Sequence, residues 1–324
     1  LWQSAGAHAQ RISAYREAAQ YYQRALDCLS DVPPGSQRDS QELALQLALG
    51  VVLNAADGYG AQRTVRAFER ARELSERTSN IEERFGALVG IWAGTGSLGG
   101  HISAMELGRE VMQAGEQSGR LSHRLIGMIC YVGGSFWVRP MAETIAVSER
   151  ILALSEPTAR LECRQNYGED PLVSGRTFMS MALWLYGQPE RARQVSAELL
   201  AHARGDGFAN ALCFSLVTSN MLHFMLREPA TVATLAAECL QQAERHGLRV
   251  WQDIANVQAG WARVLQGDET GLQLMHEGIA GNRSSMSSIE VTMQLFLLDA
   301  YAHLGRADEL LALVDPVLAT ARRR

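Results

Sequence analysis

The amino-acid sequence predicts an all-α protein, a right-handed α-solenoid of about seven to eight helix-turn-helix repeats that covers residues 1–324 as a single domain. Turn residues recur about every 40 positions, apolar residues between the turns follow three- and four-residue steps, and only 8 prolines interrupt the chain. The turns inside the helix pairs are predicted at Gly60, Gly100, Arg139, Gly187, Arg227, Gly267 and Gly305. They lie 38 to 40 residues apart, except for one interval of 48.

Between the turns, the apolar side chains fall on one face of each predicted helix. The stripe Ala18, Tyr22 and Leu26 predicts the first clear second helix, which ends before the proline-glycine turn at 33–35. Another stripe occupies the predicted helix 231–247 and comprises Val232, Leu235, Ala236, Cys239, Leu240 and Ala243. A second family of glycine breaks separates one pair from the next at Gly119, Gly207 and Gly247. Each unit is therefore predicted to run helix, tight turn, helix, loop.

The long interval coincides with a polar, proline-bounded insertion at about 156–171. It contains the adjacent acids Glu169 and Asp170, followed by Pro171. One interpretation is a solvated connector in which Asp170 and Pro171 start the next helix. The other is an irregular loop that marks the binding face of the solenoid or a contact with another domain. Adjacent residues in a loop usually point apart, so paired carboxylate chemistry is the weaker expectation.

Composition excludes several classes of function. The chain has 30 basic and 35 acidic residues and no lysine, so neither a Schiff-base lysine nor a phosphate-binding Walker lysine exists. The net charge of −5 argues against direct nucleic-acid binding. Five scattered cysteines without a CxxC pair suggest a reducing cytoplasm. No apolar run is long enough to span a membrane. Because the chain begins with Leu1, we expect a piece of a longer protein.

No motif supports catalysis, so we expect a protein that is not an enzyme and that needs no cofactor or metal. The segment 94–99 reads GxGxxG, yet it follows a helix-length run and falls where the repeat requires a turn, so we interpret it as an interhelical turn and not a dinucleotide site. The 8 histidines form no HExxH pattern. Ser135 lacks the GxSxG elbow.

An aromatic and methionine-rich stripe gives the candidate binding residues. In a solenoid of helix pairs, the first helices line the concave surface, and the repeat phase places a set of residues on or beside it. The set is Asn54, Asp57, Trp137, Met181, Trp184, Asn220, Met221, His223, Phe224 and Trp261. A groove of flexible Met and rigid Trp suits an amphipathic peptide or a small effector. The alternative is that these residues form ordinary helix-helix core.

Two phrases resemble the tetratricopeptide-repeat class of α-solenoids. The segment 17–26 has that family's pattern of Ala, aromatic and Ala-Leu in the second helix, and 187–192 matches its turn and helix start. The period departs from the family's usual 34 residues, so longer helices are expected. More narrowly, segments 1–26, 59–74 and 167–187 resemble the carboxy-terminal helical region of large bacterial signalling and transcriptional regulators. In such proteins a cyclase or DNA-binding output domain and an ATPase domain precede the repeats.

This resemblance implies a sensor or regulatory region that binds a protein, a peptide or a small effector in its concave groove. The ATPase and output domains of the same longer chain would then be its partners. The alternative is a constitutive scaffold, or a self-association domain, that receives no signal.

Overall fold

The computed structural model describes residues 1–58, 60–77, 81–97, 100–138, 140–282 and 289–323, in which every regular element is a helix. The predicted all-α fold is confirmed. The helices are α1 (Trp2–Arg11), α2 (Tyr15–Leu29), α3 (Ser36–Ala56), α4 (Gln62–Ser75), α5 (Ile81–Ser97), α6 (His101–Gln117), α7 (Leu121–Ser135), α8 (Met141–Leu154), α9 (Pro157–Tyr167), α10 (Pro171–Leu185), α11 (Pro189–Asp206), α12 (Ala209–Met225), α13 (Pro229–His246), α14 (Arg249–Leu265), α15 (Gly271–Asn282), α16 (Glu290–His303) and α17 (Ala307–Arg323).

Sixteen of these helices form consecutive antiparallel pairs, from α1 and α2 to α16 and α17, and α9 stands between the fourth and fifth pairs. The predicted turns at Gly187, Gly267 and Gly305 fall inside pairs, and each has the positive φ that glycine tolerates. Arg227 adopts the same left-handed conformation, with φ of 61°. The predicted turn at Arg139 lies outside the described residues, as do positions 59, 98 and 99 of the sequence segments discussed above.

Two sequence interpretations can be compared with the helices directly. The GxGxxG segment is not preceded by a strand, but its interpretation as an interhelical turn is wrong for 94–97, which form the last turn of α5. The interpretation of 156–171 as an irregular, solvated loop is wrong. This segment contains α9, which begins at Pro157, buries Ala159, Cys163 and Tyr167 on one face, and ends at Gly168 with φ of 73°. Four-residue spacing of three buried side chains explains why a mostly polar segment folds as a helix.

Glycines allow α6 and α7 to pack with their backbones nearly in contact. A Cβ atom added at Gly134 would lie 2.6 Å from the carbonyl oxygen of Ala104, and one at Gly108 would lie 2.5 Å from that of Cys130. Gly127 is similarly enclosed, since its Cβ would lie 2.7 Å from Met112 Cα. These positions are therefore restricted to glycine by the close approach of the two helices.

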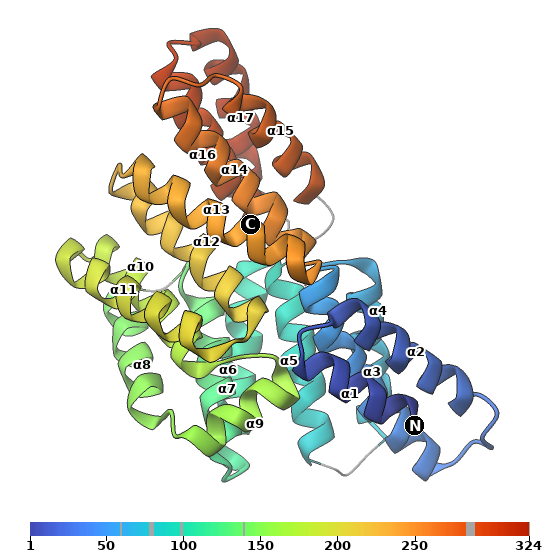
Figure 1. The fold of residues 1–324 in the computed structure, drawn as a ribbon. Helices are drawn as coiled ribbons and strands as arrows, with labels where there is room; N and C mark the ends of the chain where they lie inside the picture. Colours follow the sequence, from blue (N-terminus) through green and yellow to red (C-terminus); the bar gives the residue numbers. More distant parts are fainter. Residues whose placement is uncertain (59, 78–80, 98–99, 139, 283–288, 324) are drawn as a thin grey trace.

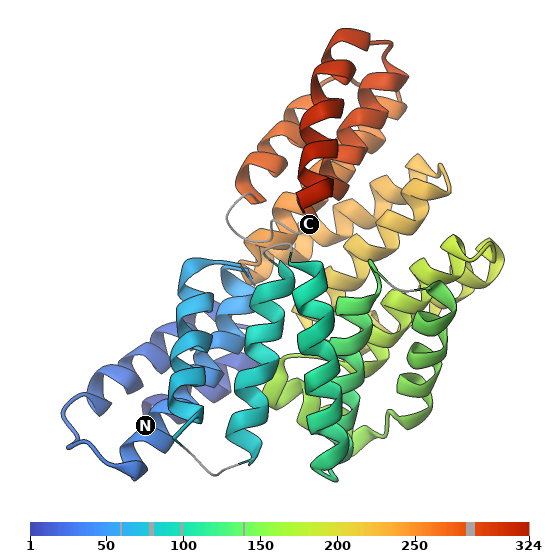
Figure 2. The same cartoon turned by 180° about the vertical axis from the view of Figure 1, so that it is seen from behind.

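The array of pairs curves until its two halves meet (Figures 1 and 2). Tyr15, which begins α2, contacts the ring of Phe208 before α12, with 6.4 Å between ring centroids. Helix α3 contacts both α9 and α14, and one buried cluster combines residues of α1 to α4 with residues of α11 to α16. Helices α15 to α17 project from one end of the array in Figure 1. Helix α9 also contacts α5 and α7.

Candidate functional site

The inner helices line a partly open cavity of about 200 Å³, referred to below as the central cavity. Its walls come mainly from α5, α7, α10 and α12, with smaller contributions from α6, α14 and the start of α16. The lining residues are Trp92, Ala93, Gly96, His101, Ala104, Ile129, Gly133, Trp137, Glu169, Ser174, Thr177, Phe178, Met181, Phe214, Thr218, Met221, Trp251, Ile289 and Thr292. The cavity thus collects residues from across 200 positions of the chain.

Aromatic side chains dominate this wall. Trp92, Trp137 and Trp251 are three of the six tryptophans in the sequence, and Phe178 and Phe214 add two more rings. Phe214 and Trp251 contact each other, with 5.7 Å between ring centroids. Large apolar rings around a small number of polar groups are characteristic of ligand sites.

The polar groups of the wall come mostly from α10 and the residues before it. Ser174 Oγ donates a hydrogen bond of 2.8 Å to Glu169 Oε2. Thr177 is fully buried, and its Oγ1 has no hydrogen-bond partner among the described residues. The buried Nε1 of Trp92 is in the same situation. Both atoms are buried from a water-sized probe, so they are enclosed by neighbouring side chains and do not offer hydrogen bonds to a molecule in the cavity.

Asp170, next to Glu169, points away from the cavity into an ion-pair network, and its side chain is fully buried. Its Oδ1 accepts a 2.9 Å hydrogen bond from the Leu172 backbone N–H and so caps α10, as one of the two sequence interpretations expected. Its Oδ2 lies 3.0 Å from Arg160 Nη2 and 3.4 Å from Arg164 Nε. Burial opposes ionisation of Asp170, but the hydrogen bond and charge of Arg160, assisted by His202 and Arg164, lower its pKa below the ordinary value.

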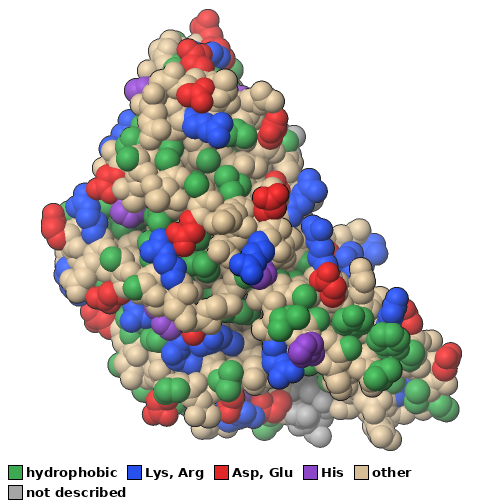
Figure 3. All heavy atoms as spheres, viewed as in Figure 1, with side chains coloured by type: hydrophobic (Ala, Val, Ile, Leu, Met, Phe, Trp, Pro, Cys, Tyr) green, Lys and Arg blue, Asp and Glu red, His purple; other side chains and the backbone are tan. Residues whose placement is uncertain are grey.

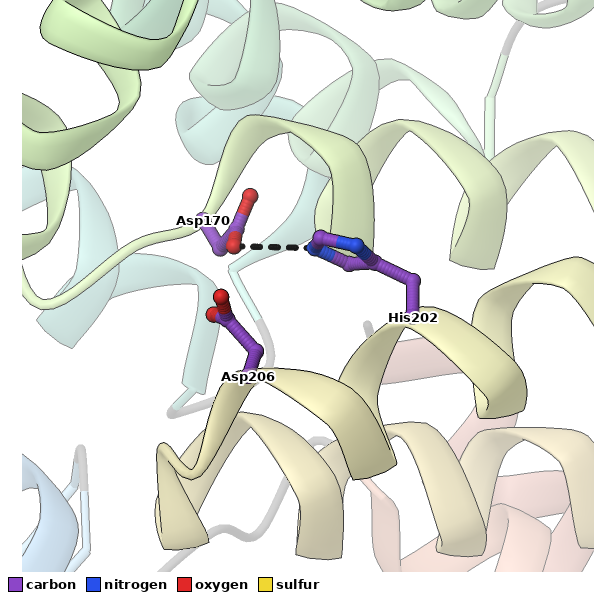
Figure 4. A group of neighbouring side chains, drawn as sticks. All are labelled: Asp170, His202 and Asp206. Carbon is purple, nitrogen blue, oxygen red and sulfur yellow. Dashed lines mark hydrogen bonds and ion pairs between the residues drawn. The ribbon is translucent and has the colours of Figure 1, made fainter.

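The network extends onto α11 through His202 and Asp206 (Figure 4). His202 Nε2 lies 3.2 Å from Asp170 Oδ2, and Arg164 Nη2 donates to Asp206 Oδ1 at 2.9 Å. The acids and the histidine are close enough together to share a metal ion, but two guanidinium groups already neutralise the two carboxylates. The cluster is therefore an ion-pair network that fastens α9 to α10 and α11.

One smaller cavity adjoins the central cavity, and an open cleft adjoins that smaller cavity. The smaller cavity, of about 30 Å³, shares Trp92 and Glu169 with the central cavity, and it in turn shares Asn166 and Tyr167 with the open cleft of about 850 Å³. The end of α9 and the residues after it therefore lie between the cleft and the central cavity. Gly168 belongs to this junction, where an added Cβ would lie 3.1 Å from Val51 Cγ1.

Of the ten residues predicted from the repeat phase, three line the central cavity. Met181 and Met221 are contributed by α10 and α12, and Trp137, which follows α7, has half of its surface exposed. Asn54 lies instead on the 30 Å³ cavity, with its Oδ1 buried and without a partner among the described residues. Three of the ten residues therefore share the central cavity with Glu169, and Asn54 shares the smaller adjoining cavity with it.

The structure places three of the other residues in contacts between helices. Asn220 is fully buried and donates from Nδ2 to Gln258 Oε1 at 3.0 Å. Trp261 is also fully buried and donates from Nε1 to Asp299 Oδ2 at 2.8 Å. Phe224 stacks on Phe296, with 4.0 Å between ring centroids. These three residues fit the helix-helix core that the sequence left open as an alternative.

The remaining three predicted residues lie outside the cavity wall. His223 Nδ1 is 2.6 Å from Glu228 Oε2 across the turn before α13. Trp184 packs on a buried cluster that includes Leu183 and Leu222. Asp57 pairs with Arg63 at 3.0 Å, at the end of α3.

The sequence prediction missed most of the aromatic wall. Trp92, Phe178, Phe214 and Trp251 were not selected, although the repeat carries a signal that relates them. Phe214, Thr218 and Met221 follow Ser174, Phe178 and Met181 by 40 residues each, and all six line the cavity. A repeat alignment anchored on Met181 and Met221 would have found this stripe.

Charged groups do not form a single-sign area on the face drawn in Figure 3, where arginines and acids are interspersed. A binding face for nucleic acid would need a concentration of positive charge. Among the described helices, none has both the length and the apolarity required to cross a lipid bilayer.

Comparison with known proteins identifies the fold but not a family. No family model matches the chain. An uncharacterized protein of Rhizobium meliloti (strain 1021) is 24% identical over 280 residues, which are 85% of this chain but only 26% of that protein. The chain thus spans about a quarter of that relative. Among solved structures, the crystal structure of Rap protein complexed with Competence and Sporulation Factor has a TM-score of 0.67 at 11% identity, covering 99% of this chain and 86% of that one. This similarity supports the tetratricopeptide-like solenoid.

Proposed function

We propose that this chain is a non-catalytic binding module that captures a peptide side chain, a protein segment or a small effector in its central cavity. In this proposal it is the sensor region of a larger cytoplasmic bacterial signalling or transcriptional regulator with ATPase and output domains. The observation that supports it best is the aromatic cavity of about 200 Å³.

The comparisons add two supporting facts. A protein with the same fold, the Rap protein, has been crystallised in complex with Competence and Sporulation Factor, so this helical architecture is able to hold a ligand. The Rhizobium meliloti relative is about four times as long as the segment it shares with this chain, which leaves room for further domains.

The closed curvature supplies a mechanism for signalling. A ligand in the central cavity would touch helices of five or more pairs, so its binding energy would depend on how the pairs are arranged. A ligand shifts an equilibrium between two arrangements only by its difference in affinity for them. The adjacent residues Glu169 and Asp170 would transmit a change in the arrangement of the pairs, because Glu169 lines the cavity and Asp170 belongs to the ion-pair network on α9 and α11.

Thermal unfolding of the protein with pools of metabolites and short peptides tests this function. A ligand present at 100 times its Kd stabilises a protein by about 2.7 kcal/mol, which is readily detected. For any hit, the substitution Trp137→Ala, on the cavity wall, should reduce the ligand-induced shift, and the matched Trp184→Ala, outside the wall, should preserve it. Comparing shifts and not midpoints removes the effect of each substitution on stability.

Two results would contradict the proposal. A ligand whose shift is equally reduced by both substitutions does not bind in the cavity. If no pool changes the midpoint and the protein instead self-associates, the constitutive scaffold becomes the better description.

A further inference from the structure

We infer that the central cavity takes a small, uncharged aromatic compound with a short aliphatic substituent, about the size of ethylbenzene. The inference rests on the proposed function, because it specifies the ligand of the same cavity as a free apolar molecule. It follows from three properties of the cavity: the polar groups of its wall are engaged within the protein, its accessible wall is aromatic, and its volume is small.

Most polar groups of the wall already have partners in the protein. Ser174 Oγ donates to Glu169 Oε2 at 2.8 Å. Thr218 Oγ1 donates to a backbone carbonyl one turn earlier in α12, also at 2.8 Å. Trp251 Nε1 donates to Asn210 Oδ1 at 2.6 Å. A ligand in the cavity therefore meets few groups with which to exchange hydrogen bonds.

The charged groups of the wall are engaged as well. Glu169 and His101 are the titratable side chains among the described residues that line the cavity, and both interact with other residues of the chain. An ion that leaves water for an apolar site without a partner loses its hydration without compensation. The cavity therefore disfavours anionic and cationic ligands alike.

The part of the wall that a ligand can touch consists largely of rings and a thioether. Trp92, Phe178, Phe214 and Met221 line the cavity and are only partly buried, and Trp137 is 50% exposed. Aromatic rings attract one another in edge-to-face and offset arrangements, and a methionine sulfur makes favourable contacts with a ring. This surface favours an aromatic ligand over an aliphatic one of the same size.

The volume of the cavity limits the size of the ligand. An apolar protein cavity of about 150 Å³ binds benzene, which has six carbon atoms. The central cavity, at about 200 Å³, is larger by about a third and so holds about eight non-hydrogen atoms. A single ring with two further carbon atoms therefore fits this space.

Ethylbenzene, benzyl alcohol and benzylammonium share a benzyl group and differ only in the terminal group. Binding of each to the unmodified protein is measured by tryptophan fluorescence and by thermal unfolding at one ionic strength. We expect ethylbenzene to bind most tightly, benzyl alcohol several-fold less tightly and benzylammonium at least tenfold less tightly, because a buried polar or charged group without a partner is costly. Benzoate, an anion of similar size, should also bind at least tenfold less tightly. These comparisons need no variant, so they do not depend on whether a substitution folds.

A fifth probe tests whether the ring could come from a peptide side chain. N-acetylphenylalaninamide presents the same benzyl group on a backbone with two amides. Those amides would lose water next to a wall whose polar groups are engaged. We therefore expect this compound to bind at least tenfold less tightly than ethylbenzene.

A substitution that fills the cavity locates the binding site. Ala93 on α5 lines the cavity and is 9% exposed, and Ala93→Leu adds an isopropyl group to the wall. It should weaken ethylbenzene binding at least tenfold, because less space is left for the ligand. Ala146→Leu adds the same group at an exposed position of α8 and should leave the affinity unchanged.

The inference is wrong if ethylbenzene does not bind, or if benzylammonium, benzoate or N-acetylphenylalaninamide binds as tightly. An unchanged affinity in Ala93→Leu would also overturn it, because the ligand would then lie outside the central cavity. None of these results removes the proposed function. That function fails separately, if the Trp137→Ala variant leaves the response to every stabilising ligand intact.

Discussion

The substitution Asp170→Asn should strongly destabilise the protein, because it removes the central charge of the α9 network. Asparagine keeps an oxygen that can accept from the Leu172 backbone N–H, so the cap of α10 is retained. The charge is lost beside Arg160 and Arg164, whose side chains are only 14% and 22% exposed. Asp206 still pairs with Arg164, so part of the network survives.

The magnitude follows from this partial loss. Removing one partner of a buried ion pair typically costs about 3–5 kcal/mol, and the surviving Asp206 contact lowers the expectation to about 2–4 kcal/mol. Because the pKa of Asp170 is lowered in the folded protein, its stabilising contribution is complete above the unfolded pKa of about 3.9. It is lost as the pH falls through the folded pKa.

The assay is urea unfolding followed by circular dichroism, at several pH values, for the wild type and Asp170→Asn. The difference in free energy of unfolding should be constant between about pH 5 and 8 and should narrow below about pH 4. Glu149→Gln serves as the exposed control, with an expected change within about 0.5 kcal/mol. A difference below 0.5 kcal/mol at pH 7 for Asp170→Asn, or one that persists undiminished in acid, would refute the assignment of the network.

Three further predictions concern a buried carboxyl group and two glycines, each glycine with a control substitution. Burial raises the pKa of Asp253 to about 6. The neutral carboxyl group is present in full below about pH 4, and its contribution to stability is lost as the pH rises through 6. In urea titrations, the free energy of unfolding of Asp253→Asn should exceed that of the wild type by about 2–3 kcal/mol at pH 8 and should be similar to it at pH 4. Gly134→Ala should destabilise the folded protein by about 1–3 kcal/mol in a thermal scan, since its Cβ would meet a carbonyl of α6. The control Gly94→Ala, whose Cβ would have nothing within 4 Å, should be neutral or stabilising in a thermal scan. Gly168→Ala should lower the free energy of unfolding by about 1–2 kcal/mol because of its φ of 73°, and it should also weaken ligand binding. The control Gly207→Ala, with φ of 71° and open space around it, should show the backbone cost alone. Equal ligand affinities in the two variants would show that Gly168 is not part of the site.

The helices and their turns could be predicted because they depend on local rules. Glycine at Gly187, Gly267 and Gly305 supplies the positive φ of each turn, and apolar residues at helical spacing supply a buried face. The helix α9 was missed because only Ala159, Cys163 and Tyr167 mark its buried face, a stripe too short to stand out in a polar segment.

The cavity was harder to predict than the helices. The repeat predicts where the first helix of each pair lies in the sequence. To predict which side of that helix faces the axis of the solenoid, the rotation of the helix about its own axis must be known to better than the 100° between adjacent residues. Met221 lines the cavity and Asn220 binds Gln258, although the two are neighbours in sequence. The contact of Tyr15 with Phe208 depends on the sum of small rotations over many pairs, which no local pattern records.

The closure of the array gives the α9 segment its significance for the proposed signalling. An open solenoid presents a long groove, whereas here the first pairs meet α12 and α14 and leave a small space beside Glu169.

A ligand that displaced Glu169 would have to work against the Asp170 network on the adjacent residue. If breaking that network costs about 3 kcal/mol, the displaced state is populated at about one part in 150, since each 1.4 kcal/mol is tenfold. A ligand must then favour the displaced state by more than about 150-fold to make it dominant, whereas in Asp170→Asn a far weaker preference would suffice. The variant that loses stability should therefore respond to ligand with the larger conformational change.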